Sequence, residues 1–168
     1  ACIGGVAYGQ IKGDECSKAI TANLGANSFD TSFATSSSPE PDGSQCASTS
    51  LDWGNSQDLW FSFTPATGGD YNFTTCDVNS YDTSMVLYAG SCDNQVACNG
   101  DSLGQSGCQG FYSSIDYTLA VNTAYFIRVG GWSGTTGAGT LTIDSSGGSG
   151  GKGACCIDGT ECFISDRE

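Results

Sequence analysis

Between residues 14 and 144, hydrophobic side chains recur at every second position, the spacing of β-strands with one buried face. In "DLWFSFT" (58–64), Leu59, Phe61 and Phe63 fall on one face and the residues between them fall on the other. The same alternation recurs at Phe29/Thr31/Phe33, Tyr71/Phe73, Met85/Leu87, Ile115/Tyr117/Leu119, Tyr125/Ile127/Val129 and Leu141/Ile143. This pattern predicts seven or eight short strands.

Turn-forming residues separate these strands. They occur as "PDG" at 41–43, "TGGD" at 67–70, "NG" at 99–100 and "GGWSGTTGAG" at 130–139. A helical period is confined to one turn near "DECSKAI", where Asp14 is the expected N-cap. We therefore predict an all-β fold, an antiparallel β-sandwich of jelly-roll-like arrangement, with a small disulfide-rich terminal module.

Composition divides the chain into four parts. These are a Gly-punctuated head at 1–13, the sandwich at 14–144, a Gly/Ser linker at 145–153 and a Cys-rich tail at 154–168. A nine-residue linker of this kind reaches ~15–18 Å, so the tail is expected to dock away from the sandwich that precedes it.

Charge and cysteine content predict a secreted or cell-surface protein. The chain has 10 cysteines, no histidine, 5 Lys+Arg and 18 Asp+Glu, with a net charge of −13. Cysteine usage at this level is typical of disulfide-bonded proteins in oxidising compartments. The negative surface repels nucleic-acid phosphates and anionic membranes, and no apolar run reaches the ~18 residues of a membrane span. Because the chain starts at Ala1 rather than Met, any signal peptide or anchor is expected to lie outside this sequence.

We do not expect an enzyme. Without histidine there is no Ser-His-Asp triad, no Cys-His nucleophile and no ordinary His-containing zinc site. A glycosidase-type carboxylate pair would have to come from the loop aspartates, which more commonly form Asx turns. No cofactor is predicted.

Ca²⁺ is the one candidate ion. Asp77 and Asp82 in "DVNSYD" and Asp101 in "NGD" supply oxygen ligands of the kind that Ca²⁺ prefers, although no EF-hand spacing is present. Structural turns are the alternative use of the same residues.

Glycans are candidate partners. Asn72 begins "NFT", an N-glycosylation acceptor pattern. The tryptophans Trp53, Trp60 and Trp132 are candidates for a sugar-stacking platform. Trp60 lies in a predicted strand, and only Trp132, in the Gly-rich segment, is expected to be exposed.

Several segments occur in the order of a known family. They are "GDECSKAI", "FDTSFAT", "QDLWFSFTP", "GGDYNFTTC", "YDTSMVLYAGSC", "VACNGD" and "YFIRVGGWSGTTGAGTLTI". Residues 14–143 thereby resemble the bacterial pre-peptidase C-terminal domain, a secreted β-sandwich attached to proteases and other exported proteins. The resemblance implies an accessory domain without catalytic residues.

The sandwich holds an even set of cysteines, which can close among themselves. From spacing we predict Cys92–Cys98 across the loop "DNQVA", Cys76–Cys108, and Cys16–Cys46.

The other cysteines are Cys2, Cys155, Cys156 and Cys162. A disulfide between neighbouring cysteines is strained, so Cys155 and Cys156 are expected to have different partners. Three cysteines in the tail cannot all pair with one another, and Cys2 supplies the missing partner. Written tail before head, "GACCIDGTECFISDREACIGGVAYGQ" resembles a small Cys-rich module of large secreted bacterial repeat proteins. Closure within one copy is the alternative, because termini often lie close together.

These observations predict a structural repeat unit of an extracellular filament or giant surface protein, joined to copies of itself head to tail. Val6 and Tyr8 alternate with small residues, so the head is a candidate strand for a neighbour's sheet edge, or else packs on its own domain. The alternative function is a secreted carbohydrate-binding or accessory module, with or without Ca²⁺.

Overall fold

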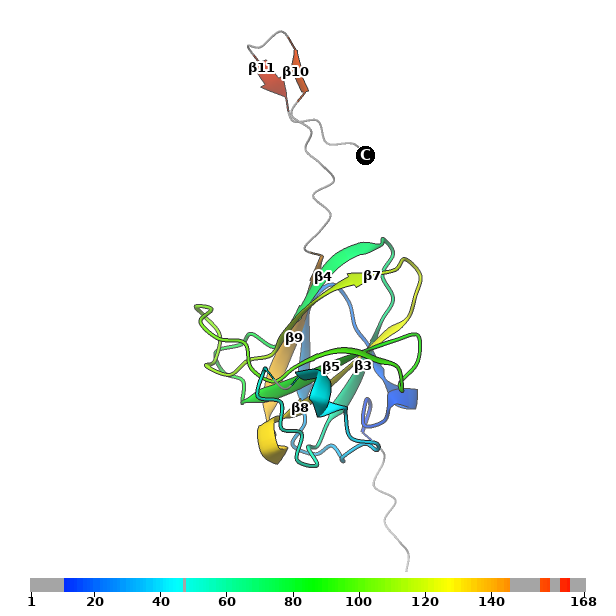
Figure 1. Cartoon of the computed structure of the whole chain (residues 1–168), viewed down its shortest axis with the longest axis vertical. Helices are drawn as coiled ribbons and strands as arrows, with labels where there is room; N and C mark the ends of the chain where they lie inside the picture. The colour runs from blue at the N-terminus through cyan, green and yellow to red at the C-terminus, as the bar shows by residue number, and fades with distance from the viewer. Residues whose placement is uncertain (1–10, 47, 146–154, 158–160, 164–168) are drawn as a thin grey trace, which may run out of the picture.

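Two sheets make up the body of the protein in a computed structural model that describes residues 11–46, 48–145, 155–157 and 161–163. The five-stranded sheet has the order β1 (Ile20–Thr21), β3 (Leu59–Phe63), β8 (Tyr125–Gly131), β5 (Thr83–Ala89) and β6 (Gln95–Asn99). The four-stranded sheet has the order β2 (Gly25–Asp30), β9 (Ala138–Ser145), β4 (Gly69–Thr74) and β7 (Ser114–Leu119). Every neighbouring pair within these two sheets is antiparallel except β1 and β3. Figure 1 labels β3, β5 and β8 of the first sheet and β4, β7 and β9 of the second.

The remaining elements are short. A separate antiparallel hairpin joins β10 (Cys155–Ile157) and β11 (Glu161–Phe163). Three 3₁₀ turns occur in the connections: η1 (Cys16–Lys18), η2 (Gly43–Cys46) and η3 (Trp132–Gly134). The described residues contain no α-helix, and so no helix long and apolar enough to cross a membrane.

The chain passes from one sheet to the other at every connection within the sandwich except β5–β6, which is a hairpin. This winding leaves most consecutive strands unpaired with each other and is the jelly-roll-like arrangement expected from the sequence. The prediction of an all-β, antiparallel sandwich is confirmed.

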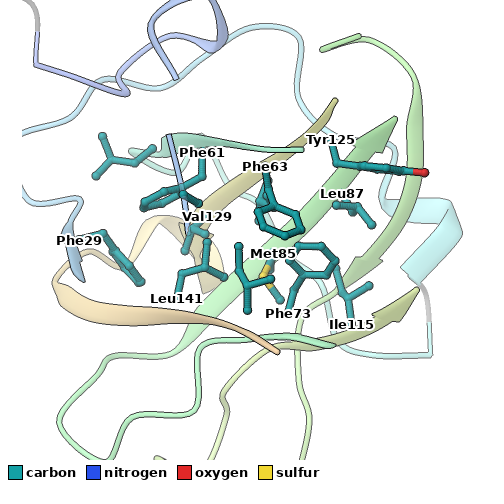
Figure 2. Packing of buried hydrophobic residues seen from close by; sticks show 14 of the residues in the cluster. Phe29, Phe61, Phe63, Phe73, Met85, Leu87, Ile115, Tyr125, Val129 and Leu141 are labelled. Atoms are coloured by element: carbon teal, nitrogen blue, oxygen red, sulfur yellow. The ribbon is translucent and has the colours of Figure 1, made fainter. Parts of the chain in front are cut away.

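The core lies between the two sheets (Figure 2). It is formed by the side chains at the alternating hydrophobic positions, which point inward from the strands. Phe61 of β3 and Phe73 of β4 have no exposed surface, and Phe63 packs edge-on against Phe73 with ring centroids 6.2 Å apart. Aromatic residues of this size dominate core energetics because each buries a large apolar area.

The outer face of the five-stranded sheet is buried as well. Trp60, Val86 and Tyr88 form a second apolar cluster there with Trp53, which comes from the long connection between β2 and β3. Six of the seven residues of β5 are buried, because that strand is covered on both sides.

The structure corrects four local expectations. Phe33 is 80% exposed because β2 ends at Asp30. Asp14 does not cap η1; its carboxylate accepts hydrogen bonds from the backbone N–H and the hydroxyl of Thr35. Residues 11–13 belong to the sandwich rather than to the head, since the Gly13 carbonyl accepts the Trp60 N–H. Strand β6, which the alternation did not predict, occupies part of "DNQVA".

Candidate functional site

Three disulfides use all six cysteines of the sandwich. They are Cys16–Cys92, Cys46–Cys98 and Cys76–Cys108, with Cα atoms 6.2, 5.8 and 4.5 Å apart. The six cysteines of the sandwich therefore pair with one another, as predicted, and the Cys76–Cys108 pairing is confirmed.

The predicted Cys92–Cys98 and Cys16–Cys46 pairings are wrong. Cys92 lies in the turn before β6, and Cys98 lies three residues beyond Gln95, the first residue of that strand. At about 3.3 Å per residue, an extended strand carries Cys98 roughly 10 Å from the turn. A disulfide spans at most about 7 Å between Cα atoms. Cys98 instead meets Cys46 on η2, which packs against β6.

Arg128 lies at the centre of the outer face of the five-stranded sheet. In register it is opposite Trp60 of β3 on one side and Val86 of β5 on the other. Its side chain is only 1% exposed, and its guanidinium lies 4.7 Å from the ring centroid of Trp53 and 5.1 Å from that of Trp60. The cation is therefore held between two aromatic rings, a favourable arrangement for guanidinium.

The charge of Arg128 is neutralised inside the protein. Nη2 lies 2.9 Å from Oδ2 of Asp58, which is fully buried, and it also donates to the Ser37 carbonyl. Nη1 donates to the Pro39 carbonyl. Ser37 completes the network, because its N–H and hydroxyl both donate to Asp58 and its hydroxyl oxygen accepts from Trp60 Nε1. We call Arg128, Asp58, Ser37, Trp53 and Trp60 the arginine cluster.

A cleft of about 500 Å³ opens above this cluster. Its floor is Trp60, Tyr88 and Arg128, and its walls are residues 37–42, Gln45, the Cys16–Cys92 disulfide and residues 93–95. Both aromatic rings are about 95% buried, at 4% and 5% exposure, so the cleft offers no open stacking platform.

The rim of this cleft is acidic. Glu15, Glu40, Asp42 and Asp93 line it, while Arg128, the only cation among the described lining residues, is already paired with Asp58. Such a cleft suits neutral polar or cationic groups and disfavours anions. Sequence reasoning missed the arginine cluster; the signal was a lone Arg in an apolar strand, "YFIRVGG".

A second cleft of about 490 Å³ lies beside the end of β3. Residues 21–24 form one wall and residues 62–64, 66 and 67 form the other, and Tyr71 of β4 also lines the cleft. We call it the β3 groove. None of its lining residues is charged.

The three aspartates proposed as Ca²⁺ ligands do not come together as a set. Within residues 11–46 and 48–145, no group of three or more acidic or cysteine side chains is arranged to hold a metal ion. Both carboxylate oxygens of Asp77 are used as acceptors, one from the Asn79 N–H and one from the Thr140 hydroxyl.

Asp82 and Asp101 share one feature. Each has one carboxylate oxygen that is buried without a hydrogen-bond partner in the described part of the chain. Burial raises the pKa of Asp82 to about 6, and the negative charge of Asp101 adds to the rise. Burial also raises the pKa of Asp101. Both carboxylates are thus poorly solvated, and a proton or a cation would stabilise them.

Replacing Asp82 with asparagine should therefore stabilise the fold at neutral pH. The folded-state pKa of about 6 exceeds the unfolded value of about 3.9, so the favourable contribution of protonated Asp82 is present below about pH 4 and is lost as the pH rises through 6. Thermal unfolding should give Asp82→Asn a higher Tm than the wild type at pH 7.5, with the gap closing at pH 4. Asp144→Asn, at an exposed position on β9, is the control and should change little at either pH. A gap of the same size at both pH values would contradict this account.

The candidate glycan residues lie apart. Asn72 is in the middle of β4, and its amide nitrogen donates to the Ser114 hydroxyl and to Asp116 Oδ1, both at 2.9 Å. An attached glycan would displace both bonds, so this position does not suit glycosylation. Trp53 and Trp60 are buried, whereas Trp132 is 44% exposed, as expected.

The head residues Cys2, Val6 and Tyr8 lie outside the described residues. In the tail, the β10–β11 register places the Cα of Cys156 opposite that of Cys162, and the Cα of Cys155 opposite that of Phe163.

Comparison with known proteins gives no family assignment. No family model and no curated protein matches the chain. Among solved structures, the pre-peptidase C-terminal domain of a collagenase from Bacillus anthracis aligns with 75% of this chain and 94% of its own, at 13% identity and a TM-score of 0.46.

Two other structures align less closely. A family 35 carbohydrate binding module from an environmental isolate covers 75% of this chain and 86% of its own, at 12% identity and a TM-score of 0.38. A β-glucosidase from Kluyveromyces marxianus, in complex with glucose, covers 53% of this chain and 10% of its own, at 20% identity and a TM-score of 0.36. At TM-scores below 0.5 these likenesses carry no argument about function.

Proposed function

We propose that this protein is a structural repeat unit of an extracellular assembly, in which copies are joined head to tail by disulfides between their Cys-rich ends. The observation that supports this most strongly is the closure of the sandwich: its six cysteines pair with one another. Of the 10 cysteines in the chain, only Cys2, Cys155, Cys156 and Cys162 remain for other bonds.

The tail hairpin suggests which of these four cysteines bond with each other. Residues directly opposite each other in an antiparallel pair have Cα atoms about 4.5–5.5 Å apart, a separation within the range of disulfides. Cys156 and Cys162 are opposite each other, while Cys155 is opposite Phe163. The proposed bonds are therefore Cys156–Cys162 within the tail and Cys155 to Cys2 of the next copy.

The ends of the described sandwich favour a linear arrangement over closure within one copy. Figure 1 shows the chain entering near residue 11 at one end of the sandwich and leaving β9 at the other. A contact between two different ends that does not close generates an open chain of copies. The three disulfides of the sandwich also fit an oxidising, extracellular environment.

Electrophoresis with and without reductant tests the proposal. Without reductant we expect a ladder of multiples of the 17.2 kDa chain, and with reductant a single band. A single 17.2 kDa species under both conditions would contradict the proposal.

A Ca²⁺-dependent carbohydrate-binding role is the second candidate, favoured by one observation. The backbone N–H of the exposed Trp132 donates to the backbone carbonyl of Asp82, so an exposed aromatic residue adjoins one of the aspartates proposed as Ca²⁺ ligands. An exposed aromatic residue that adjoins an acidic residue is a combination suited to hold a sugar ring near a cation.

For this second role, Trp132→Ala should abolish binding on a glycan array in the presence of Ca²⁺, and a chelator should do the same to the wild type. Phe33→Ala is the matched control, because Phe33 is also exposed but comes from a different loop. Glycan binding that persists in Trp132→Ala would overturn the role.

A further inference from the structure

The β3 groove exists because β1 is very short. β1 pairs with β3 only at Ile20 and Thr21, and the last backbone bond between the two segments runs from the Ala22 N–H to the Ser62 carbonyl. Beyond that bond the two segments diverge and leave the groove between them.

One residue beyond β3, the backbone edge that faces the groove is open. On this edge of the strand the Trp60 N–H donates to Gly13, and the Ser62 carbonyl accepts from Ala22. Thr64 is the next residue on the same edge, and it is exposed. Its backbone groups make no hydrogen bond with the residues that the structure describes. Unpaired groups at a sheet edge are a template for another strand.

The lining of the groove is uncharged and partly apolar. Phe63 and Tyr71 form its inner surface, and Leu24 at its rim is 58% exposed. In a chain of net charge −13, a groove without any charged residue suits an uncharged strand with apolar side chains at alternate positions.

The groove lies where the chain leaves the sandwich. Tyr71 is the register partner of Ser145, the last residue of β9. The chain enters at the opposite end, near residue 11 (Figure 1). The groove therefore lies at the end of the sandwich from which a link to the head of the next copy would start.

We propose that the β3 groove receives the head of the next copy, with residues 5–9 ("GVAYG") added as a strand beside Thr64 and with Val6 and Tyr8 directed into the groove. This inference rests on the proposed head-to-tail link. Residues 1–10 contain no charged side chain, which matches the groove.

The lengths of the chain segments permit this docking. The ten residues from Ser145 to Cys155 reach roughly 17 Å as a flexible Gly/Ser segment. An extended segment from Cys2 to Val6 adds about 13 Å. A bond between Cys155 and the next copy's Cys2 therefore keeps Val6 and Tyr8 within reach of the groove.

Photo-cross-linking between differently labelled copies tests the docking. The full 168-residue chain is made with p-benzoylphenylalanine in place of Tyr8, in ¹⁴N and ¹⁵N forms, and the two are mixed under reducing conditions and reoxidised. We expect mixed ¹⁴N/¹⁵N cross-links from position 8 to peptides that contain residues 21–24 or 62–71. Cross-links that join only identically labelled peptides, or that map elsewhere, would overturn the inference.

A matched pair of variants makes the test specific. Leu24→Glu places a charge in the groove and should lower the yield of these cross-links about tenfold, since it removes the burial of a leucine. Leu103→Glu changes a leucine that is 69% exposed and lies outside the groove, and it should leave the yield unchanged. Equal yields in the two variants would overturn the docking site.

Amide hydrogen exchange gives a readout without substitution. The Thr64 N–H should exchange at least tenfold more slowly in the oxidised assembly than in the reduced, single chain. If the disulfide ladder forms but neither the cross-links nor this protection appears, the groove inference fails while the proposed function stands. If no ladder forms, both fail.

Discussion

Replacing Cys155 with serine is expected to remove the reductant-sensitive ladder and to leave single chains, with at most dimers joined through Cys2. Cys155 is the tail cysteine that has no cysteine opposite it in the β10–β11 register, so it is the residue available to the next copy. Electrophoresis without reductant measures the change, and the loss should be complete rather than partial because each junction depends on this single bond.

The matched control keeps Cys155 and removes the other two tail cysteines. The double variant Cys156→Ser/Cys162→Ser should retain the ladder, because these residues are opposite each other and are expected to bond within the tail. A ladder that persists in Cys155→Ser but disappears in the double variant would reverse the proposed assignment of the bonds.

Replacing Arg128 with methionine should lower the free energy of unfolding by about 3–5 kcal/mol, the range found when one partner of a buried ion pair is removed. Asp58 has no exposed surface, and without Arg128 its carboxylate would keep only the hydrogen bonds from Ser37. The variant would also lose the guanidinium contacts with Trp53 and Trp60. Chemical denaturation of the oxidised chain at neutral pH measures the cost.

Two further variants separate the ion pair from other effects. Arg128→Met/Asp58→Asn should recover part of the loss, since no unpaired charge is left buried. Lys18→Met removes an exposed cation from the end of η1 and should change the free energy of unfolding by no more than about 0.5 kcal/mol. A cost below about 1 kcal/mol for Arg128→Met would show that the arginine cluster does not hold the outer layer in place.

The arginine cluster explains how the sandwich acquires a third layer. The connection between β2 and β3 crosses the outer face of the five-stranded sheet and brings Ser37 and Trp53 onto Arg128. The Cys46–Cys98 disulfide fastens the same connection to β6. Both faces of the sheet are therefore covered.

The alternation of the sequence predicted the core well, because the inward face of a strand is set by a local period of two. Leu59, Phe61 and Phe63 all lie in the main core, and the intervening Trp60 lies on the opposite face. Such a pattern depends on neighbouring residues alone, so it can be read without knowing the topology.

Contacts between distant segments could not be predicted in the same way. The wrong partners for Cys92 and Cys98 followed from treating "DNQVA" as a loop, because its mixed composition hides strand β6. Arg128 was missed for a related reason: an arginine on the outer face of a strand is expected to reach solvent. Arg128 is buried because the β2–β3 connection covers it, and no local sequence period determines the path of that connection.

In the candidate site too, local features could be predicted from the sequence and contacts between distant segments could not. The exposure of Trp132 was predictable from its glycine-rich surroundings, and its position beside Asp82 was not. The separation of Asp77 from Asp82 and Asp101 likewise depends on which hydrogen bonds each loop makes.

Disulfide mapping of the assembly tests the central claim most directly. Chains labelled with ¹⁴N and ¹⁵N are mixed while reduced, reoxidised, and digested without reductant for mass spectrometry. We predict a linked peptide pair that contains Cys2 from one label and Cys155 from the other. Cys2 bonded to Cys155 only within identically labelled chains would contradict the head-to-tail account.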